Sequence, residues 1–471
     1  MEKIQIKVPE ELKYLAFAYR AAGGCLYIVG GAVRNALLRL PYSDIDITGC
    51  LLQDSVEKLC RDSGISCVRM STELGTLRIS IKGQIYEYTP FRAEEYGRDG
   101  KHRPEKVLFG VSMEEDAKRR DFTVNALYAD AINGMVQDPL GGLGDIQKRL
   151  LRCCAGDTLE SDALRIMRLI RFSGELGFHI EENTFELAKR NANKILDIAG
   201  ERILDEFSKI LLCDVKYKEL QKDPYESVPD EAQCVYACLK KLEETGVTEK
   251  LFPELMEGNG IAQRSDYHKY TILEHAYHSC SCAVPELTLR LAALFHDIGK
   301  PVCLKETGNY HMHMVYGESI ARVVLARFHM SNAQKSDILF LIRNHMYDIQ
   351  NLAKKKNLRK SFAEWGRKNT RNLILIREAD IRGSGTRPEY FADTWRCTYE
   401  KMLSDGTPFT LHDLKISGTE IMKETGIREG EAIGQALDAL RAECILHPKY
   451  NNREKLFQLL RTKEIQRILF E

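Results

Sequence analysis

Apolar and polar residues follow two different periods along this chain of 471 residues. Before about residue 150, apolar or alternating runs such as 26–29, 76–81 and 84–91 are typical of strands, and Lys82-Gly83 between the last two runs predicts a hairpin turn. Beyond residue 155, apolar residues recur every three or four positions, as in packed amphipathic helices. The pattern predicts an α+β fold, in which a mixed sheet with helices precedes an all-helical remainder.

In residues 27–47, two acids follow a predicted strand, a turn and a helix along the chain. The apolar run up to Val29 predicts a buried strand, and Gly30-Gly31 lets the backbone approach a ligand before a helix whose N-terminus can hold phosphate. Asp44 and Asp46 alternate with isoleucines, so both carboxylates point to one face of a short strand. Adjacent carboxylates repel each other unless a cation lies between them, and Mg²⁺ with a triphosphate meets this need. The segment indicates nucleotidyl transfer.

Four further motifs follow this segment in order: RRDFTVNAL at 119–127, DPLGGLGD at 138–145, DALRIMR at 162–168 and GERILDE at 200–206. Together the five elements resemble the bacterial CCA-adding tRNA nucleotidyltransferases of class II, whose poly(A) polymerase-like head belongs to the DNA polymerase β superfamily. The resemblance implies a polymerase β-type head and a cytoplasmic enzyme that uses Mg²⁺. It further implies template-independent addition of C and A from CTP and ATP to the 3′ end of tRNA.

The resemblance also implies roles for individual head residues. Asp44 and Asp46 would be catalytic and hold Mg²⁺. Glu87, in a partial match to the family's glutamate-bearing strand, would be a third acid, although a solvent-facing strand glutamate is the alternative. Nucleotide contacts would come from eight residues: Gly30, Gly31, Arg34, Arg120, Asp121, Asp162, Arg165 and Arg168.

Asp162 and Arg165 carry the expected choice of base. Three positions apart on a helix expected to begin at Asp162, they would present acceptor and donors on one face. Such a pair would accept C and A and reject U and G, whereas a helix-surface salt bridge worth a few tenths of a kcal/mol is the alternative. Ser161 stands where the family usually has a glutamate that steadies the arginine. Glu160 is no automatic substitute, because one residue turns a side chain about 100° around a helix.

Residues 92–107, between the hairpin and the RRDFT motif, predict a mobile loop. Glycines, charges and one proline leave no apolar period in this segment. The family shortens the comparable loop in enzymes that stop after CC. The length of the segment therefore argues against a CC-only enzyme.

A second set of candidate metal ligands lies in the middle of the chain. His275, His296-Asp297 and Asp380 form an H…HD…D series, and LFHDIGK at 294–300 resembles the core of HD-domain phosphohydrolases. Imidazole and carboxylate ligands suit a divalent ion such as Mg²⁺, Mn²⁺ or Ni²⁺. His313 and His345 fall where two-metal members of that group carry further histidines. Any one of these histidines alone would more often be structural.

The motifs divide the chain into four expected domains. These are a nucleotidyltransferase head (1–155), a helical neck that binds the nucleotide base and RNA (156–220), an HD phosphohydrolase-like domain (221–395) and a C-terminal helical tRNA-binding region (396–471). Pro224 and Pro229 predict a loop near 221–231. Six basic residues of the last region could meet phosphates, although a solvated helix face would look the same: Lys449, Arg453, Lys455, Arg461, Lys463 and Arg467.

Composition restricts the class of partner and the compartment. The 68 Lys and Arg balance 68 Asp and Glu, so RNA contacts must come from local basic patches. Fourteen cysteines form no Cys-x-x-Cys pair, and no signal peptide precedes them, which favours reduced thiols in a cytoplasm. No membrane partner is expected, because Arg20 and Arg34 interrupt the apolar stretch 14–38.

Three alternatives to CCA addition stay open. An A-adding or poly(A) polymerase shares every head motif. An HD phosphohydrolase whose head only holds RNA is disfavoured by the intact Asp44 and Asp46, and a tRNA-binding protein would have no use for two metal sites. The HD substrate and metal and the oligomeric state are left open.

Overall fold

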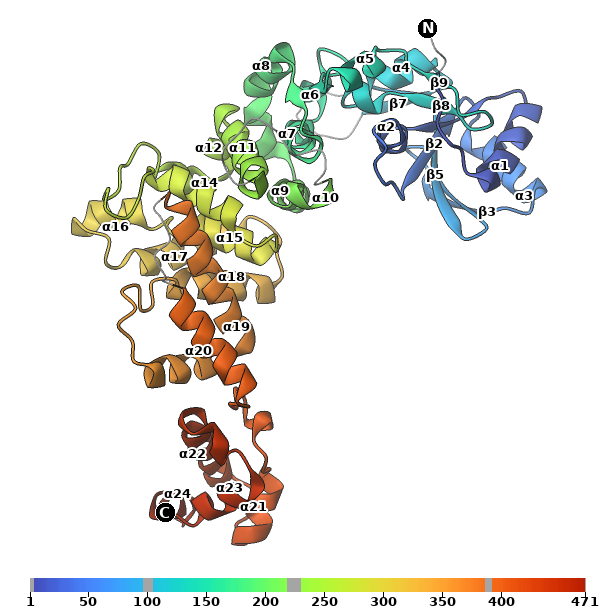
Figure 1. Ribbon diagram of the computed structural model, residues 1–471. Coiled ribbons are helices and arrows are strands. Elements are labelled where there is room, and N and C mark those ends of the chain that lie inside the picture. The colour runs from blue at the N-terminus through green and yellow to red at the C-terminus, as the bar shows by residue number, and fades with distance from the viewer. Residues whose placement is uncertain (1–3, 96–104, 218–229, 386–391, 471) are drawn as a thin grey trace. The chain divides into compact units, whose positions relative to one another are not determined.

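The computed structural model describes residues 4–95, 105–217, 230–385 and 392–470. The chain forms two compact units, Met1–Pro253 and Glu254–Glu471. The first unit holds a mixed sheet with helices and the second is helical, which confirms the predicted fold class (Figure 1). None of the described helices is both long enough and apolar enough to cross a membrane.

A seven-stranded sheet forms the head, with the strand order β3-β4-β5-β2-β1-β8-β9. Within it β2 and β5 are parallel, and the other neighbours are antiparallel. The predicted hairpin is β4-β5, and Lys82 and Gly83 at its turn have φ of 49° and 87°, as tight hairpin turns require. The strands are β1 (Leu26–Val29), β2 (Ile45–Gly49), β3 (Ser66–Ser71), β4 (Thr76–Ile81), β5 (Gln84–Pro90), β8 (Tyr128–Asp130) and β9 (Val136–Gln137).

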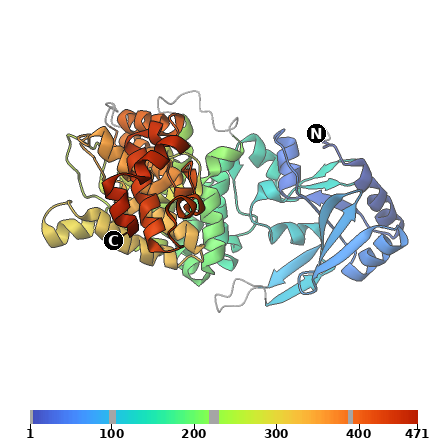
Figure 2. The same cartoon turned by 90° about the horizontal axis from the view of Figure 1, so that it is seen from below.

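The main core of the head lies between this sheet and three helices, α1 (Glu10–Ala21), α2 (Gly31–Leu37) and α3 (Gln53–Asp62) (Figure 2). Successive side chains of a strand point to opposite faces. Ile45 and Ile47 of β2 therefore enter this core and leave Asp46 on the opposite face.

The segment predicted as a mobile loop is partly ordered as strands. β6 (Arg92–Glu95) and β7 (Lys106–Phe109) pair antiparallel, so the prediction is wrong for both ends of the segment. Val107, Leu108 and Phe109 are consecutive apolar residues, a composition that favours a strand. Residues 96–104 lie outside the described residues.

The rest of the first unit is largely helical, with α7 (Leu164–Leu176) at its centre. α7 is buried along most of its length and packs against α9, α10 and α11. Residues 230–253, which the motifs predict to belong to the HD domain, lie in this first unit. The four-domain division stays a prediction, and most of the predicted 221–231 loop lies outside the described residues. The remaining elements are α4 (Met113–Lys118), η1 (Thr123–Asn125), α5 (Gly142–Gln147), β10 (Leu150–Leu151), α6 (Thr158–Ser161), β11 (His179–Ile180), α8 (Glu182–Asn191), η2 (Ala192–Asp197), α9 (Gly200–Leu211), α10 (Cys213–Lys216), α11 (Asp230–Glu244) and α12 (Val247–Leu251).

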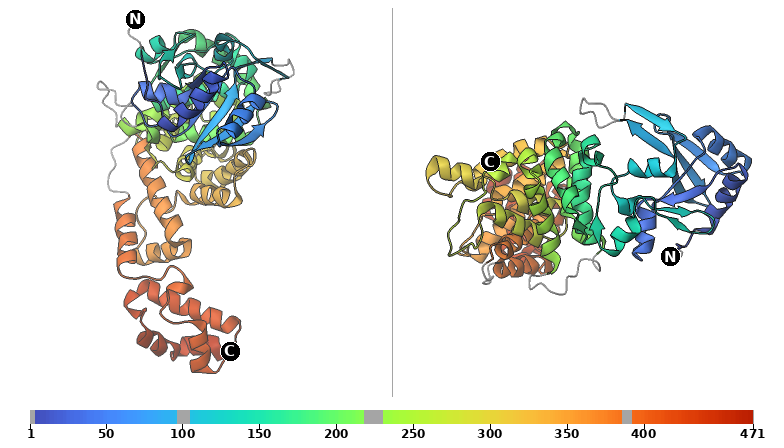
Figure 3. Two further views of the ribbon diagram at one scale, coloured as in Figure 1. Left: turned by 90° about the vertical axis from the view of Figure 1, so that its right-hand side faces the viewer. Right: turned by 90° about the horizontal axis from the view of Figure 1, so that it is seen from above.

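The second unit packs its helices around α19 (Lys355–Gly383), which contacts α14, α15, α18 and α20 (Figure 3). Gly366, with φ 81° and ψ 170°, breaks α19 into two helical segments. A separate apolar cluster forms the core of the last helices. The other elements are α13 (Pro253–Met256), α14 (Ile272–Cys282), α15 (Leu287–Phe295), α16 (Lys300–Thr307), α17 (His313–Ala326), α18 (Asn332–Asn344), α20 (Asp393–Ser404), η4 (Leu411–Asp413), α21 (Gly418–Thr425), α22 (Glu431–Leu446), η5 (Pro448–Tyr450), α23 (Arg453–Leu460) and α24 (Lys463–Phe470).

Candidate active sites

Three acids gather on the open face of the head sheet. Asp46 is the second residue of β2 and pairs in register with Val29 of β1 and Glu87 of the parallel strand β5. Asp44 lies just before β2 and is exposed. Glu87 is also exposed, and its carboxylate lies 3.7 Å from the Arg78 guanidinium. The structure thus brings together Asp46 and Glu87, which are 41 positions apart in the sequence.

The surroundings of the Asp46 carboxylate disfavour its charged form. One side is open to solvent, but the protein around the rest of it desolvates the group, and this desolvation raises its pKa. The Glu87 and Asp44 charges raise it further, while Arg120 opposes them. A bound cation would relieve this repulsion, so the cluster fits a divalent metal ion with oxygen ligands.

Gly30 shapes the turn beside these acids. Its φ of 77° and ψ of −139° suit glycine, and it immediately precedes α2. A Cβ at this position would lie 3.8 Å from Asp46 Oδ2, so the backbone turn borders the carboxylate. Gly31 follows as the first residue of α2.

Arg34 is held inside the protein. It is 4% exposed, and its guanidinium donates to Asn125 Oδ1 at 2.7 Å and to Asn35 Oδ1 at 2.9 and 3.1 Å. Burial lowers the pKa of this arginine. In this arrangement Arg34 positions the two asparagines, and its predicted contact with a triphosphate stays a prediction.

Asp121 of the RRDFT motif binds the helix that follows the head. Its Oδ2 accepts from Arg168 Nη2 at 2.6 Å and Nε at 3.1 Å, and its Oδ1 accepts from Asn125 Nδ2 at 3.0 Å. Burial opposes ionisation, but the Arg168 guanidinium lowers the pKa of Asp121 to about 2. The pair therefore fixes α7 against the head.

Asp116 organises the neighbouring arginines and was missed by the sequence reasoning. It is fully buried and bonds to Arg119 at 2.8 Å, Arg120 at 2.9 Å and the Tyr128 hydroxyl at 2.7 Å. Desolvation is outweighed by Arg120 and Arg119, which lower the pKa of Asp116 to about 2. The sequence feature that could have indicated this role is the capping box of Ser112 and Glu115. It starts the short helix α4, and Asp116 is the fourth residue of that helix and points inward.

Asp162 does not lie on the helix that carries Arg165, which corrects the predicted one-face geometry. Asp162 has an extended backbone with φ −145° and ψ 101°, and α7 begins only at Leu164. The Asp162 carboxylate accepts from the Leu164 backbone N–H at 3.1 Å, because a short acid beside a helix start satisfies its free N–H groups. Its other oxygen lies 3.4 Å from Arg202.

Arg165 is steadied by backbone carbonyls. Its Nη1 donates to the Thr158 carbonyl at 3.2 Å and its Nη2 to the Arg119 carbonyl at 2.8 Å. Ser161 and Glu160 belong to α6, and Glu160 pairs with Lys194 at 3.1 Å. The structure therefore shows another way of holding the arginine, in place of the family's usual glutamate.

In the second unit the six predicted metal-site residues converge into one buried cluster. His275 lies on α14, His296 and Asp297 follow α15, and Asp380 lies on α19. His313 starts α17 and His345 follows α18. The five residues other than Asp380 are at most 4% exposed.

Asp297 joins two groups of ligands. Its Oδ2 lies 3.5 Å from His275 Nε2 and 3.3 Å from His296 Nε2, while its Oδ1 lies 3.2 Å from His313 Nε2 and 3.7 Å from His345 Nε2. Each group can hold a metal ion. A carboxylate shared in this way is typical of two-metal sites.

Asp380 completes the first group. Its Oδ1 lies 2.9 Å from His275 Nε2 and 3.5 Å from His296 Nε2. Burial alone would lower the pKa of His296, but the Asp297 and Asp380 carboxylates raise it to about 10. Without a metal ion, a proton on His296 would balance part of the acid charge.

The ring orientation of the four histidines also fits metal ligation. In each, Nδ1 lies 2.6–3.2 Å from a backbone carbonyl, which turns Nε2 toward the centre. This second hydrogen bond is the usual partner of a metal-bound imidazole. The Nε2 atoms approach within 3.0–3.1 Å across the pairs His275–His296 and His313–His345. Sequence reasoning missed Lys300, whose ammonium lies 2.5 Å from Asp297 Oδ2.

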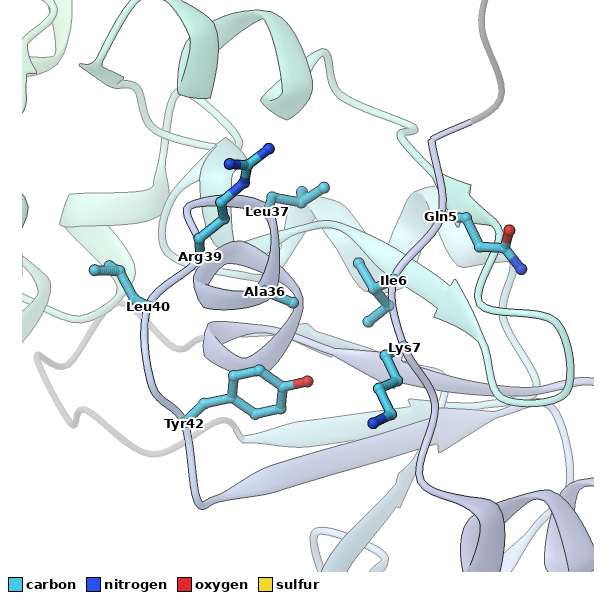
Figure 4. A pocket seen from close by; sticks show the side chains of 8 residues that line it. All are labelled: Gln5, Ile6, Lys7, Ala36, Leu37, Arg39, Leu40 and Tyr42. Atoms are coloured by element: carbon cyan, nitrogen blue, oxygen red, sulfur yellow. The ribbon is translucent and has the colours of Figure 1, made fainter.

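A cavity of about 490 Å³ also lies in the head. It opens between the N-terminal segment and the end of α2, and none of its eight lining residues is an acid (Figure 4). They are Gln5, Ile6, Lys7, Ala36, Leu37, Arg39, Leu40 and Tyr42. The cavity therefore lacks the ligands that the nucleotidyl-transfer chemistry needs.

Three segments match known protein families. Residues 26–152 match the Poly A polymerase head domain, 177–220 match the probable RNA and SrmB-binding site of polymerase A, and 271–382 match the HD domain. The three occur in the order that the sequence motifs predicted. The chain thus resembles a Poly A polymerase head joined to a polymerase A RNA-binding segment and an HD domain.

Curated relatives match a little over two fifths of the chain. The CCA-adding enzyme of Streptococcus sanguinis (strain SK36) is 41% identical over 204 residues, which are 43% of this chain and 50% of that enzyme. That of Streptococcus agalactiae serotype V is 43% identical over 196 residues, 41% of this chain and 47% of that enzyme. The chain spans about half the length of the curated relatives it matches.

Solved structures of CCA-adding enzymes have a similar fold over nearly the whole chain. The Bacillus stearothermophilus CCA-adding enzyme in complex with CTP is 23% identical, with a TM-score of 0.64 over 97% of this chain and 98% of that one. The Thermotoga maritima CCA-adding enzyme complexed with tRNA is 16% identical, with a TM-score of 0.61 over 95% and 94%. At these identities the likeness establishes the fold.

Proposed function

We propose that this chain adds C and A nucleotides from CTP and ATP to the 3′ end of tRNA without a template. The observation that carries the proposal is the placement of Asp46 beside Glu87, with Asp44 at the start of the strand, on the open face of a Poly A polymerase head. Similarity to CCA-adding enzymes over the same region supports it.

In this proposal Asp44, Asp46 and Glu87 hold Mg²⁺. The cluster fits because three acids on one open face carry a repulsion that only a cation relieves. When bound, Mg²⁺ would neutralise the triphosphate and help to activate the RNA 3′-hydroxyl. The residues of the chain orient the reactants: Gly30 keeps the backbone close to the acids, and Arg165 and Arg168 lie on the helix beside the head.

The test is to incubate tRNA that lacks its 3′ CCA with CTP and ATP, separately and together, and to sequence the products. We expect CC with CTP alone and CCA with both nucleotides. Addition of A alone, or runs of A on any RNA, would identify an A-adding or poly(A) polymerase instead. A lack of incorporation with intact tRNA binding would favour a head that only holds RNA.

We propose a second activity, metal-dependent hydrolysis of a phosphoester at the HD cluster. Four imidazoles fixed by backbone carbonyls favour a transition ion such as Mn²⁺ or Ni²⁺ over Mg²⁺. A metal ion bound there would lower the pKa of a water ligand and polarise the ester. Hydrolysis of a 2′,3′-cyclic nucleotide in the presence of each of the three ions tests this activity.

The cytoplasmic location is also a proposal. None of the 14 cysteines forms a disulfide in the structure, as expected for a chain kept under reducing conditions. Fractionation of cells that express the tagged chain tests the location.

A further inference from the structure

Three cysteines of the first unit come together beneath α7. Cys213 begins α10, and Cys234 and Cys238 lie one turn apart on α11, so their thiols share a helix face. Cys213 Sγ lies 3.1 Å from Cys234 Sγ and 3.9 Å from Cys238 Sγ. Cys213 and Cys238 are fully buried and Cys234 is half-buried.

The backbone of α7 leaves room for these thiols at one glycine. A Cβ at Gly174 would lie only 2.5 Å from Cys238 Sγ and 2.9 Å from Cys213 Sγ, so a larger residue would displace the sulphurs. The Gly174 carbonyl accepts from the Cys234 thiol at 3.3 Å, and the Ile170 carbonyl accepts from the Cys238 thiol at 3.5 Å. The three cysteines thus occupy a shaped space against the helix that carries Arg165 and Arg168.

We propose that Cys213, Cys234 and Cys238 bind one thiophilic divalent ion, with Zn²⁺ as the best fit. Three thiolates at about 2.3 Å from a tetrahedral Zn²⁺ lie about 3.8 Å from one another. The three Sγ atoms all lie within 4.8 Å of one another, and the Cys213–Cys238 distance of 3.9 Å already has this value. The remaining tetrahedral position is left to a water molecule, an arrangement that Zn²⁺ also adopts.

A disulfide is the competing use of the same residues. It requires an S–S distance of about 2.05 Å, so Cys213 and Cys234 would have to approach by about 1 Å and leave Cys238 unpaired. A metal ion uses all three sulphurs with smaller movements. Its effect would be to link α10 to α11, and so to stiffen the support on which α7 and its two arginines pack.

Co²⁺ substitution distinguishes this site from the HD cluster, which contributes histidines and aspartates. The full chain, purified under reducing conditions and stripped of metal, is titrated with Co²⁺ and then with Zn²⁺. We expect thiolate-to-cobalt charge-transfer absorption in the near ultraviolet once Co²⁺ exceeds the amount that the HD cluster holds, and we expect Zn²⁺ to abolish it. The absence of this band would overturn the proposal.

Two serine variants complete the test. Cys234→Ser, at the half-buried position, should lose the band while circular dichroism shows an unchanged fold, and Zn²⁺ should raise the Tm of the parent chain more than that of the variant. Cys397→Ser, at an exposed cysteine, should behave like the parent. A Cys213–Cys234 disulfide found by mass spectrometry in reduced, metal-free preparations would also contradict the proposal.

Discussion

Glu87 is the register partner of Asp46 across two parallel strands, and this pairing places two carboxylates side by side on an open sheet face. Like charges at neighbouring positions of a sheet destabilise it. The head therefore carries an electrostatic cost that substrate and metal binding would offset.

Replacement of Asp46 tests this use directly. We expect Asp46→Asn to lower nucleotide incorporation by roughly 10³-fold or more, because loss of a metal ligand removes several kcal/mol of charge stabilisation. Binding of tRNA, measured by filter retention, should stay within about twofold, since the basic surfaces are untouched. Glu73→Gln, at an exposed acid of the β3-β4 turn, is the matched control. Near-normal incorporation by Asp46→Asn would contradict the proposal that the acids of the head catalyse nucleotide addition.

The sequence predicted this part of the site because strand alternation has a period of two. Because Asp44 and Asp46 alternate with isoleucines, both carboxylates must lie on the face opposite the core. The predicted hairpin adds Glu87 to the same sheet. The helix start at Asp162 was predicted wrongly, because an aspartate that caps a helix and one inside it share the same spacing to Arg165. The cysteine cluster depends on packing between segments distant in sequence, for which no local period gives a signal. Asp116 instead bonds to Arg119, Arg120 and Tyr128, close to it in sequence, and the capping box before it was a local signal.

Arg165 is expected to act in the choice of nucleotide. Arg165→Ala should reduce discrimination of CTP and ATP against UTP and GTP by roughly 10- to 100-fold, as for the loss of a bidentate base contact worth about 1–3 kcal/mol. Incorporation ratios from competition between the four nucleotides measure it. Arg190→Ala, at an exposed arginine of α8, should leave the ratios unchanged. If Arg165→Ala keeps the parent ratios, the residue serves only to join Thr158 and Arg119.

Ser161 gives a prediction that differs from the one suggested by the family pattern. Because the Thr158 and Arg119 carbonyls already hold Arg165, Ser161→Glu should change base selection by less than about twofold. The same competition assay measures this, with Ser161→Ala as the control for loss of the hydroxyl. A marked gain in selectivity for Ser161→Glu would show that the two carbonyls hold the arginine too loosely.

Asp297 should separate the two proposed activities. Its carboxylate joins both groups of histidines, so Asp297→Ala should remove metal from both groups and abolish phosphoester hydrolysis. Nucleotide incorporation should stay within about threefold, because the head has its own acids. Elemental analysis for Mn or Ni, and the two activity assays on one preparation, give the comparison. Asp337→Ala, at an acid of α18 outside the cluster, is the control.

Metal binding by the HD cluster should strengthen with rising pH. The carboxylates of Asp297 and Asp380 raise the pKa of His296 to about 10, so its Nε2 carries a proton in the metal-free protein at neutral pH. That proton must leave before Nε2 can bind an ion, and the affinity should therefore rise by up to about tenfold per pH unit until about pH 10. The folding stability of the metal-free protein depends on pH with the opposite sign. A folded-state pKa above the usual value near 6.5 gives a stabilising contribution that is full below about pH 6.5 and is lost as the pH approaches 10.

Calorimetric titration with Mn²⁺ at pH 6, 7 and 8, in buffers of different ionisation enthalpy, counts the protons released. Mn²⁺ is the appropriate probe because thiolates bind it weakly, so the cysteine cluster contributes little. We expect about one proton per chain from His296, and the same count for His329→Gln, a change at an exposed histidine. A pH-independent affinity with no proton release would show that His296 is neutral before the ion binds, and that Lys300 alone balances the charge of Asp297.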